Sequence, residues 1–199
     1  MKIVIKEYQK SWNEDFLKLK DEIQSALRGM KITVDHIGST SVNGLGAKPI
    51  IDILVGVEKE TELDKTIQPM QNKGFTYHKK YERVSEKWTA WPERRYFIKL
   101  KSVDALTPPL LIDFDDEIND NFIKHSHIHT LVKDTNAWKR HIAFRDYLRN
   151  HSNIRDEYYL LKKEISKQEF ENGLKYNEAK NDYVKEIERK AMKWYNENN

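Results

Sequence analysis

A short stretch near the start of the chain holds residue types that suit phosphate chemistry. In order, these residues are Gly38, Ser39, Thr40, Lys48 and Asp52. A glycine–serine turn at a strand end leaves backbone N–H groups and hydroxyls that can bind phosphate oxygens, and glycine lets a ligand approach the backbone closely. A lysine can neutralise phosphate charge, and a carboxylate can hold Mg²⁺ or Mn²⁺. The pattern predicts a site for a nucleoside triphosphate and for phosphoryl or nucleotidyl transfer.

Asp52 is the most informative residue of this set. It lies in the apolar run 50–57, which is typical of a strand buried on both faces. An unpaired carboxylate there would cost several kcal/mol, roughly, so Asp52 needs a partner, and a metal ion at a strand end is one. Under the simpler alternative, Gly38 and Ser39 form only a turn and Lys48 is a solvated loop residue.

Histidines on a later predicted strand could complete a metal site. His127 and His129 alternate, so both side chains point to one face, and with Asp52 they would make a two-histidine, one-carboxylate site. Alternatively, they only form hydrogen bonds at the sheet surface. His36 could join the site or orient the turn, and Asp113 is a further candidate acid.

Arg145 and Arg149 lie one turn apart on a predicted helix. Such a pair can clamp a phosphate or a carboxylate. The alternative is an ion pair on the helix surface with Asp146 or Asp156.

Periodicity predicts the elements that position these residues. Strands are expected at 2–8, 32–37, 50–57, 75–77, 95–101, 110–114 and 128–132. Helices are expected from Ser11 to Gly29, at 61–73, and after Asp134 at 138–149, 154–165 and 183–194. The fold class is therefore α+β: a mixed sheet with N-terminal helices and a helical C-terminal third. We expect a core at 1–132 and a helical extension at 133–199 packed on it.

Composition narrows the partners. The 35 basic and 32 acidic residues give a net charge of only +3, too little for the basic face of a nucleic-acid-binding protein. The chain has no cysteine, no run of about 20 apolar residues that could span a membrane, and a charged, short N-terminal segment unlike a signal peptide. We expect a cytoplasmic protein with a small-molecule nucleotide as its partner. The sequence leaves the oligomeric state open.

The residues from His36 to Ile53 resemble the signature of the GrpB-like family. The resemblance continues at Arg95–Phe97, His127–His129, Phe144–Arg149, Tyr158–Lys162 and Ala191–Trp194, so it spans nearly the whole chain. That family, whose activity is uncharacterised, is similar to the nucleotidyltransferase superfamily. The resemblance implies a nucleotidyltransferase-like fold and metal-dependent nucleotidyl or pyrophosphoryl transfer to a small molecule.

One departure from the superfamily bears on activity. Members with known chemistry place two acids at alternate strand positions, whereas here the alternate position after Asp52 is occupied by Leu54. The alternative is therefore a catalytically degenerate module that binds a nucleotide or a phosphate and has a regulatory role. The segment 103–124 looks longer than in the family, as an insertion would be.

Overall fold

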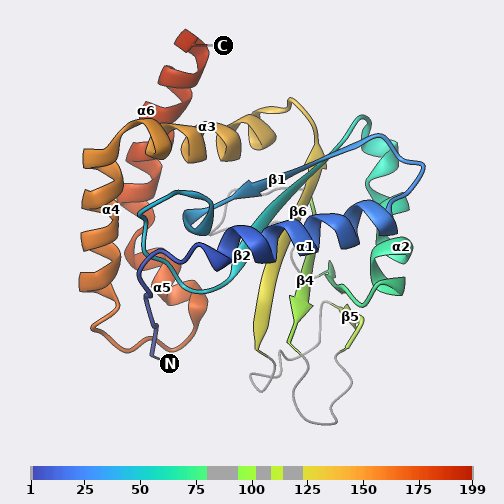
Figure 1. Ribbon diagram of the computed structural model, residues 1–199, viewed down its shortest axis with the longest axis horizontal. Coiled ribbons are helices and arrows are strands. Elements are labelled where there is room, and N and C mark those ends of the chain that lie inside the picture. Colours follow the sequence, from blue (N-terminus) through green and yellow to red (C-terminus); the bar gives the residue numbers. More distant parts are fainter. Residues whose placement is uncertain (1, 80–93, 102–108, 114–122, 199) are drawn as a thin grey trace.

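A six-stranded mixed sheet forms the centre of the protein (Figure 1). The computed structural model describes residues 2–79, 94–101, 109–113 and 123–198. The strands are β1 (Ile32–Ile37), β2 (Ile51–Val57), β3 (Thr76–His78), β4 (Arg95–Leu100), β5 (Leu111–Ile112) and β6 (Lys124–Val132), in the spatial order β1-β2-β6-β4-β3-β5.

The register of the central strands determines which side chains meet. β2 runs antiparallel to β1 and parallel to β6, while β4 is antiparallel to β6. Asp52 therefore lies opposite Ile37 on one side and His127 on the other. Because β1 ends at Ile37, the turn that follows it lies beside Asp52.

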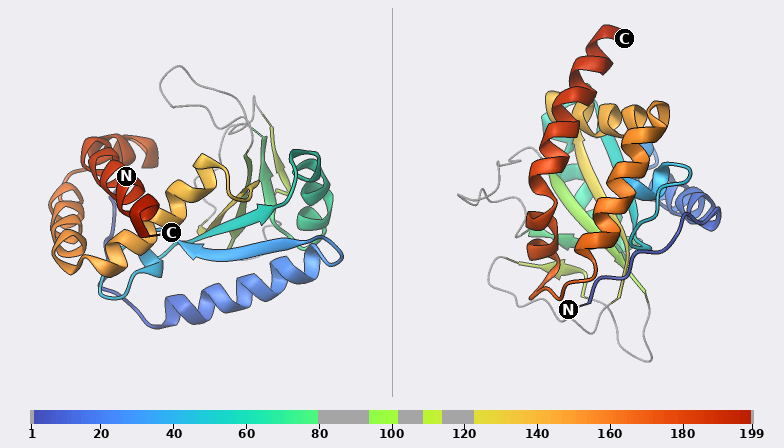
Figure 2. Two further views of the ribbon diagram at one scale, coloured as in Figure 1. Left: turned by 90° about the horizontal axis from the view of Figure 1, so that it is seen from above. Right: turned by 90° about the vertical axis from the view of Figure 1, so that its left-hand side faces the viewer.

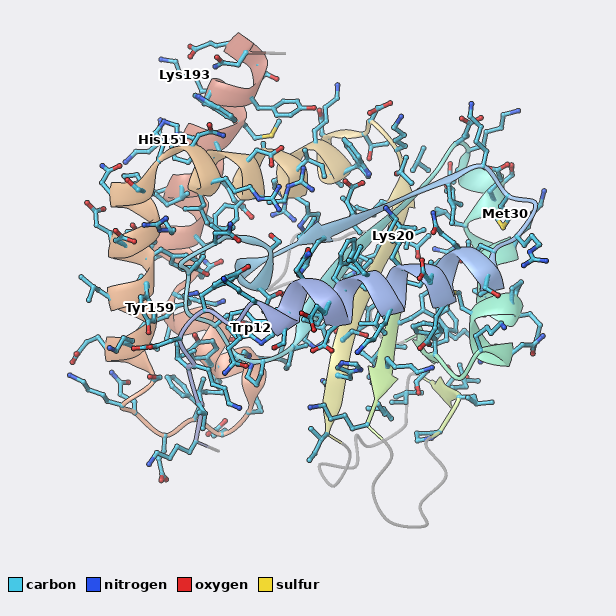
Figure 3. All side chains as sticks on the ribbon, viewed as in Figure 1. Trp12, Lys20, Met30, His151, Tyr159 and Lys193 are labelled. Atoms are coloured by element: carbon cyan, nitrogen blue, oxygen red, sulfur yellow. The ribbon has the colours of Figure 1, made fainter. Side chains whose placement is uncertain are left out.

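Helices cover both faces of the sheet, as Figure 2 shows from above. Helix α1 (Ser11–Ala26) covers one face with Trp12, Phe16, Leu19 and Ile23, whose spacing of three and four residues forms one apolar stripe. These side chains pack on apolar residues of β1, β2, β4 and β6, and Figure 3 shows this layer with Trp12 labelled. Trp138 and Ile142 of α3 (Asn136–Asn150) pack on Leu54 from the opposite face.

The C-terminal third is helical. After α3 come α4 (Ser152–Ile165), α5 (Gly173–Ala179) and α6 (Asn181–Asn198). Val42 and Leu45, from the loop between β1 and β2, are buried with Leu148, Tyr158 and Ile187 from three of these helices. The helical third thus packs directly on the predicted phosphate-binding loop. The division into units at 1–132 and 133–199 stays a prediction.

The α+β class and the mixed sheet are confirmed, and several element boundaries differ. No strand forms at 2–8, where Lys2 and Lys6 make only isolated bridges, to Glu169 and Ala47. The predicted helix at 61–73 consists of two 3-10 turns, Glu60–Glu62 and Asp64–Thr66, followed by α2 (Ile67–Asn72). β6 begins at Lys124, four residues earlier than predicted, and α5 was not expected.

The insertion predicted at 103–124 falls largely outside the described residues. Among the helices that the structure describes, none combines the length and the apolar character that crossing a membrane requires.

Candidate functional site

The Asp52 side chain lies directly against Gly38, the first residue of the predicted phosphate-binding turn. Gly38 has φ +68° and ψ −172°, a backbone conformation that side chains other than glycine rarely adopt. A Cβ atom at this position would come within 2.9 Å of the Asp52 Cβ and 3.0 Å of its Cγ. Only glycine therefore allows the turn and the carboxylate to approach this closely.

Asp52 is paired with a histidine of the neighbouring strand. The Asp52 Oδ1 atom lies 3.1 Å from Nδ1 of His127, and the two side chains are 30% and 22% exposed. Burial alone would raise the pKa of Asp52, but the hydrogen bond and charge of His127, with the charges of Lys48 and Lys180, lower it below the ordinary value. The carboxylate is thus ionised at neutral pH.

This pairing determines the chemistry that His127 has to offer. An ionised carboxylate only accepts hydrogen bonds, so Nδ1 carries the shared proton, and in the neutral form of the ring Nε2 carries a lone pair. Within the residues that the structure describes, the buried Nε2 atom has no hydrogen-bond partner. His127 therefore presents a proton acceptor that Asp52 orients.

Three lysine amines lie over the rings of two tyrosines. The Nζ atoms of Lys48 and Lys180 lie 4.7 and 5.2 Å from the centre of the Tyr176 ring, and Nζ of Lys162 lies 4.5 Å from that of Tyr158. Amine positions over ring faces are favourable for the charged form. Lysines from the loop, from α4 and from the α5–α6 junction thus meet at one place.

Burial makes these amines easier to deprotonate. Burial, assisted by the charge of Lys180, lowers the pKa of Lys48 to about 8 and that of Lys162 to about 6. Burial likewise lowers the pKa of Lys180. In each case the negative charge of Asp52 acts in the opposite direction. All three amines therefore lie within the electrostatic reach of the same acid.

Ser39 connects the turn to these helical residues. Its Oγ atom lies 3.0 Å from Nζ of Lys162 and also forms a hydrogen bond with the Tyr158 hydroxyl. Lys162 donates in addition to the carbonyl of Gly46.

His129, predicted beside Asp52, lies elsewhere. It is opposite Leu54 in the sheet, its Nδ1 atom is 3.3 Å from Arg94 Nη1, and its ring is 5.4 Å from that of His141. Burial and the charge of Arg94 lower its pKa well below the ordinary value. Among the described residues, no group of three or more His, Cys, Asp or Glu side chains is placed to share a metal ion. The structure thus does not assemble the three-ligand site predicted from Asp52, His127 and His129.

Two further predicted residues support the turn from its other side. The His36 Nε2 atom lies 3.0 Å from the Thr40 hydroxyl, and the His36 ring stacks on Phe16 of α1. Both His36 and Thr40 are buried. His36 orients the turn, which was one of the two predicted roles, and the Thr40 hydroxyl already has a partner within the protein.

The arginines take positions around the loop and not around Asp52. Arg145 forms ion pairs with Asp146 and Asp35 and donates to the His36 carbonyl. Arg149 donates twice to the Ser41 carbonyl. With Ser41, Asn43 and Arg155, it lines a polar pocket of about 290 Å³. The ion-pair alternative holds for both arginines, because Arg149 also lies 3.5 Å from Asp146, the predicted partner.

Asp113 is distant from the site. It follows β5 at the far edge of the sheet, where three strands separate it from β2, and it lies 3.7 Å from Lys79. A shared role with Asp52 is wrong on this topology.

Comparison with known proteins identifies the family. The sequence profile described as GrpB protein matches residues 2–190. This chain is a member of the GrpB family. The family resemblance read from the motif is thereby confirmed.

Relatives of this GrpB-family protein are spread over several bacteria. The UPF0157 protein YqkA of Bacillus subtilis is 31% identical over 97% of the chain, which spans about half (48%) of that relative's length. The Glutamate-rich protein GrpB of Alkalihalophilus pseudofirmus is 26% identical, with 93% of each chain covered. The crystal structure of conserved protein GrpB from Enterococcus faecalis superposes with a TM-score of 0.74 at 31% identity, covering 96% of this chain and 99% of that one.

Sequence reasoning missed four residues of the GrpB-family site: Tyr158, Lys162, Tyr176 and Lys180. The tyrosines fit an apolar stripe at helical spacing, which is typical of a core. One signal was present: Lys162 lies one turn after Tyr158 on the apolar side of α4, where a charged residue needs a partner. That partner became visible only once α4 was placed on the loop.

Proposed function

We propose that this GrpB-family protein binds the triphosphate of a nucleotide beside Asp52 and transfers a nucleotidyl or pyrophosphoryl group to a small molecule. The observation that carries the proposal is the surplus of amines over acids at Asp52. Lys48 and Lys180 repel each other in a poorly solvated place, where one carboxylate, already paired with His127, balances them incompletely. A polyanionic ligand would relieve that repulsion and restore both amines to their charged form.

Each residue then has a distinct task. Lys48 and Lys180 bind phosphate oxygens, and Gly38 lets the phosphate approach the backbone. His127, oriented by Asp52, takes the proton from the acceptor hydroxyl through its free Nε2 lone pair. The similarity to nucleotidyltransferases that the motif implies is part of this proposal.

A divalent cation enters the proposal only as an ion carried by the nucleotide. Mg²⁺ and Mn²⁺ prefer several oxygen ligands. At this site the described residues offer only the Asp52 carboxylate, and one of its oxygens is already hydrogen-bonded to His127. These residues do not fit a metal that the protein holds alone. The phosphates of a bound nucleotide would have to supply the other ligands.

Leu54 is the observation that favours the second candidate, a module that binds without transfer. It is fully buried and packs against Trp138 and Ile142, so no second acid lies beside Asp52 on this strand. Product release with a set of small hydroxyl and amine acceptors separates the two candidates, since nucleotidyl transfer releases pyrophosphate and pyrophosphoryl transfer releases a nucleoside monophosphate. Release of either product that disappears in Asp52→Asn supports transfer, and binding with release of neither from any acceptor supports the module.

Calorimetry with ATP, GTP, CTP and UTP, each with and without Mg²⁺, tests binding. We expect at least one nucleotide to bind, and Lys48→Met or Lys180→Met to weaken it about tenfold or more, since a charged hydrogen bond contributes roughly 1.5–3 kcal/mol. Lys185→Met, on an exposed position of α6, is the matched control and should bind normally. If none of the four nucleotides binds, the proposal is wrong.

The same titration reports protons. At pH 8 Lys48 is about half protonated, since its pKa is about 8, and a bound phosphate raises that pKa. The protein therefore takes a proton from the buffer, and binding should be less exothermic in Tris than in HEPES because Tris has the larger ionisation enthalpy. The difference should shrink in Lys48→Met. Equal heats in both buffers would show that the phosphate does not meet Lys48.

A further inference from the structure

Ser39 and Lys162 form a closely held pair at the predicted phosphate-binding turn. Lys162 is 2% exposed, and its amine lies 3.0 Å from the Ser39 hydroxyl oxygen. Ser39 itself is only partly buried, so it faces both the helix and the place where a ligand would lie. A hydroxyl in contact with a buried amine has the geometry of a nucleophile next to its base.

Two further groups contact the pair. The Tyr158 hydroxyl forms a hydrogen bond with Ser39 and lies 3.4 Å from the Lys180 amine. Burial raises the pKa of Tyr158, so this hydroxyl keeps its proton. Lys162 donates one N–H to the Gly46 carbonyl. Its charged form also donates to the Ser39 hydroxyl, whereas its neutral form can accept the Ser39 proton.

The charge state of Lys162 determines which of the two groups donates in this contact. Burial comes first among the causes that lower its pKa to about 6, the charge of Lys180 adds to it, and Asp52 acts in the opposite direction. At pH 7 neutral amines therefore outnumber charged ones by about ten to one. A neutral amine has a lone pair that can accept the proton of Ser39.

We propose that Ser39 is a nucleophile, that Lys162 is its general base, and that Ser39 takes the nucleotidyl group of the bound nucleotide as a covalent intermediate. The identity of the donor rests on the proposed function, whereas the reactivity of the pair does not. Ser39 Oγ forms a bond to the α-phosphorus as its proton moves to Lys162. The bond from that phosphorus to pyrophosphate breaks, and pyrophosphate leaves with the electron pair towards Lys48 and Lys180.

The second half-reaction restores the enzyme. An acceptor hydroxyl, deprotonated by His127, attacks the serine-bound phosphorus. The bond between phosphorus and Ser39 Oγ breaks, and Lys162 returns the proton to Ser39. Ser39 and Lys162 thus end as they began, His127 releases the acceptor's proton to solvent, and the acceptor carries the nucleotidyl group.

A fluorophosphonate probe tests the pair without any nucleotide, because an activated serine displaces fluoride from phosphorus. We expect intact-mass and peptide analysis of the full chain to find the adduct on Ser39. Labelling should slow as the pH falls through about 6, where Lys162 becomes charged. Lys162→Met should lower the rate about 100-fold or more, the usual contribution of a general base. Lys163→Met, at an exposed neighbour, should label like the wild type.

The proposal is overturned if the probe does not label Ser39, or if it labels Ser39 in folded Lys162→Met as fast as in the wild type. If Lys162→Met does not fold, the wild-type pH profile decides, and a labelling rate that stays flat from pH 5 to 8 is equally fatal. Labelling of Ser39 in a protein that binds none of the four nucleotides keeps the nucleophile and removes the nucleotidyl donor. Nucleotide binding by a protein whose Ser39 is unreactive keeps the proposed function and removes the nucleophile.

Discussion

Replacing Gly38 by alanine perturbs the contact on which the site depends. The glycine-only backbone conformation at φ +68° and ψ −172° costs another residue roughly 1–3 kcal/mol. The added methyl group would also lie within 3.0 Å of the Asp52 Cβ and Cγ atoms, and such overpacking costs roughly 1–3 kcal/mol. We expect Gly38→Ala to lower the free energy of unfolding by about 2–6 kcal/mol and to displace Asp52 from His127.

Gly29→Ala is the matched control. Gly29 also has positive φ, at +93°, but a Cβ atom there meets nothing within 4 Å, so only the backbone cost of roughly 1–2 kcal/mol applies. Urea unfolding of both variants measures the difference, and calorimetry with nucleotide should show a loss in Gly38→Ala alone. Equal destabilisation, with nucleotide binding intact in both, would refute the close approach of Asp52 to the turn.

Two further predictions concern the supports of the turn. Burial lowers the pKa of His36 to about 4, so below pH 6.5 the unfolded chain binds a proton at this residue that the folded protein does not. The neutral His36 ring therefore contributes fully to folding stability above pH 6.5, and that contribution is lost as the pH falls towards 4. Between pH 7.5 and 5, urea unfolding should show a loss of stability about 2 kcal/mol smaller in His36→Gln than in the wild type, and identical losses would contradict the assignment. Arg145→Met leaves Asp35 without its cation and Asp146 with Arg149 alone, and should cost roughly 2–4 kcal/mol with nucleotide affinity unchanged. A selective loss of affinity would instead restore the phosphate clamp predicted from the sequence.

The sequence alone could predict the parts of the site that depend on local pattern. A buried strand interrupted by Asp52, a glycine turn before it and alternating histidines after it are all visible over short windows. The structure pairs β2 with β6 and so brings His127 beside Asp52, as two neighbouring strands would; the parallel direction of this pairing was not predicted. The same periodicities predicted the mixed α+β architecture, which the structure confirms.

Local pattern could not predict which polar groups satisfy one another across the structure. The Arg145–Asp35 pair joins residues 110 positions apart, and the Lys162–Ser39 contact joins residues 123 apart. Alternation correctly placed His129 on the same face as His127, but a step of two residues along the strand carried it away from Asp52 to Arg94. The error was to treat a shared face as a shared site.

The origin of the amines argues that the helical third is part of the proposed site. Lys48 comes from the loop, whereas Lys162 and Lys180 come from α4 and from the residue between α5 and α6. The same helices bury Val42 and Leu45 of the loop, so the packing that holds the loop also positions these two amines. A chain ending at residue 132 would lose both the cover of the loop and two of its three amines. Asp52, left with Lys48 and His127, would then face the turn without the positive charge that makes a phosphate its expected neighbour.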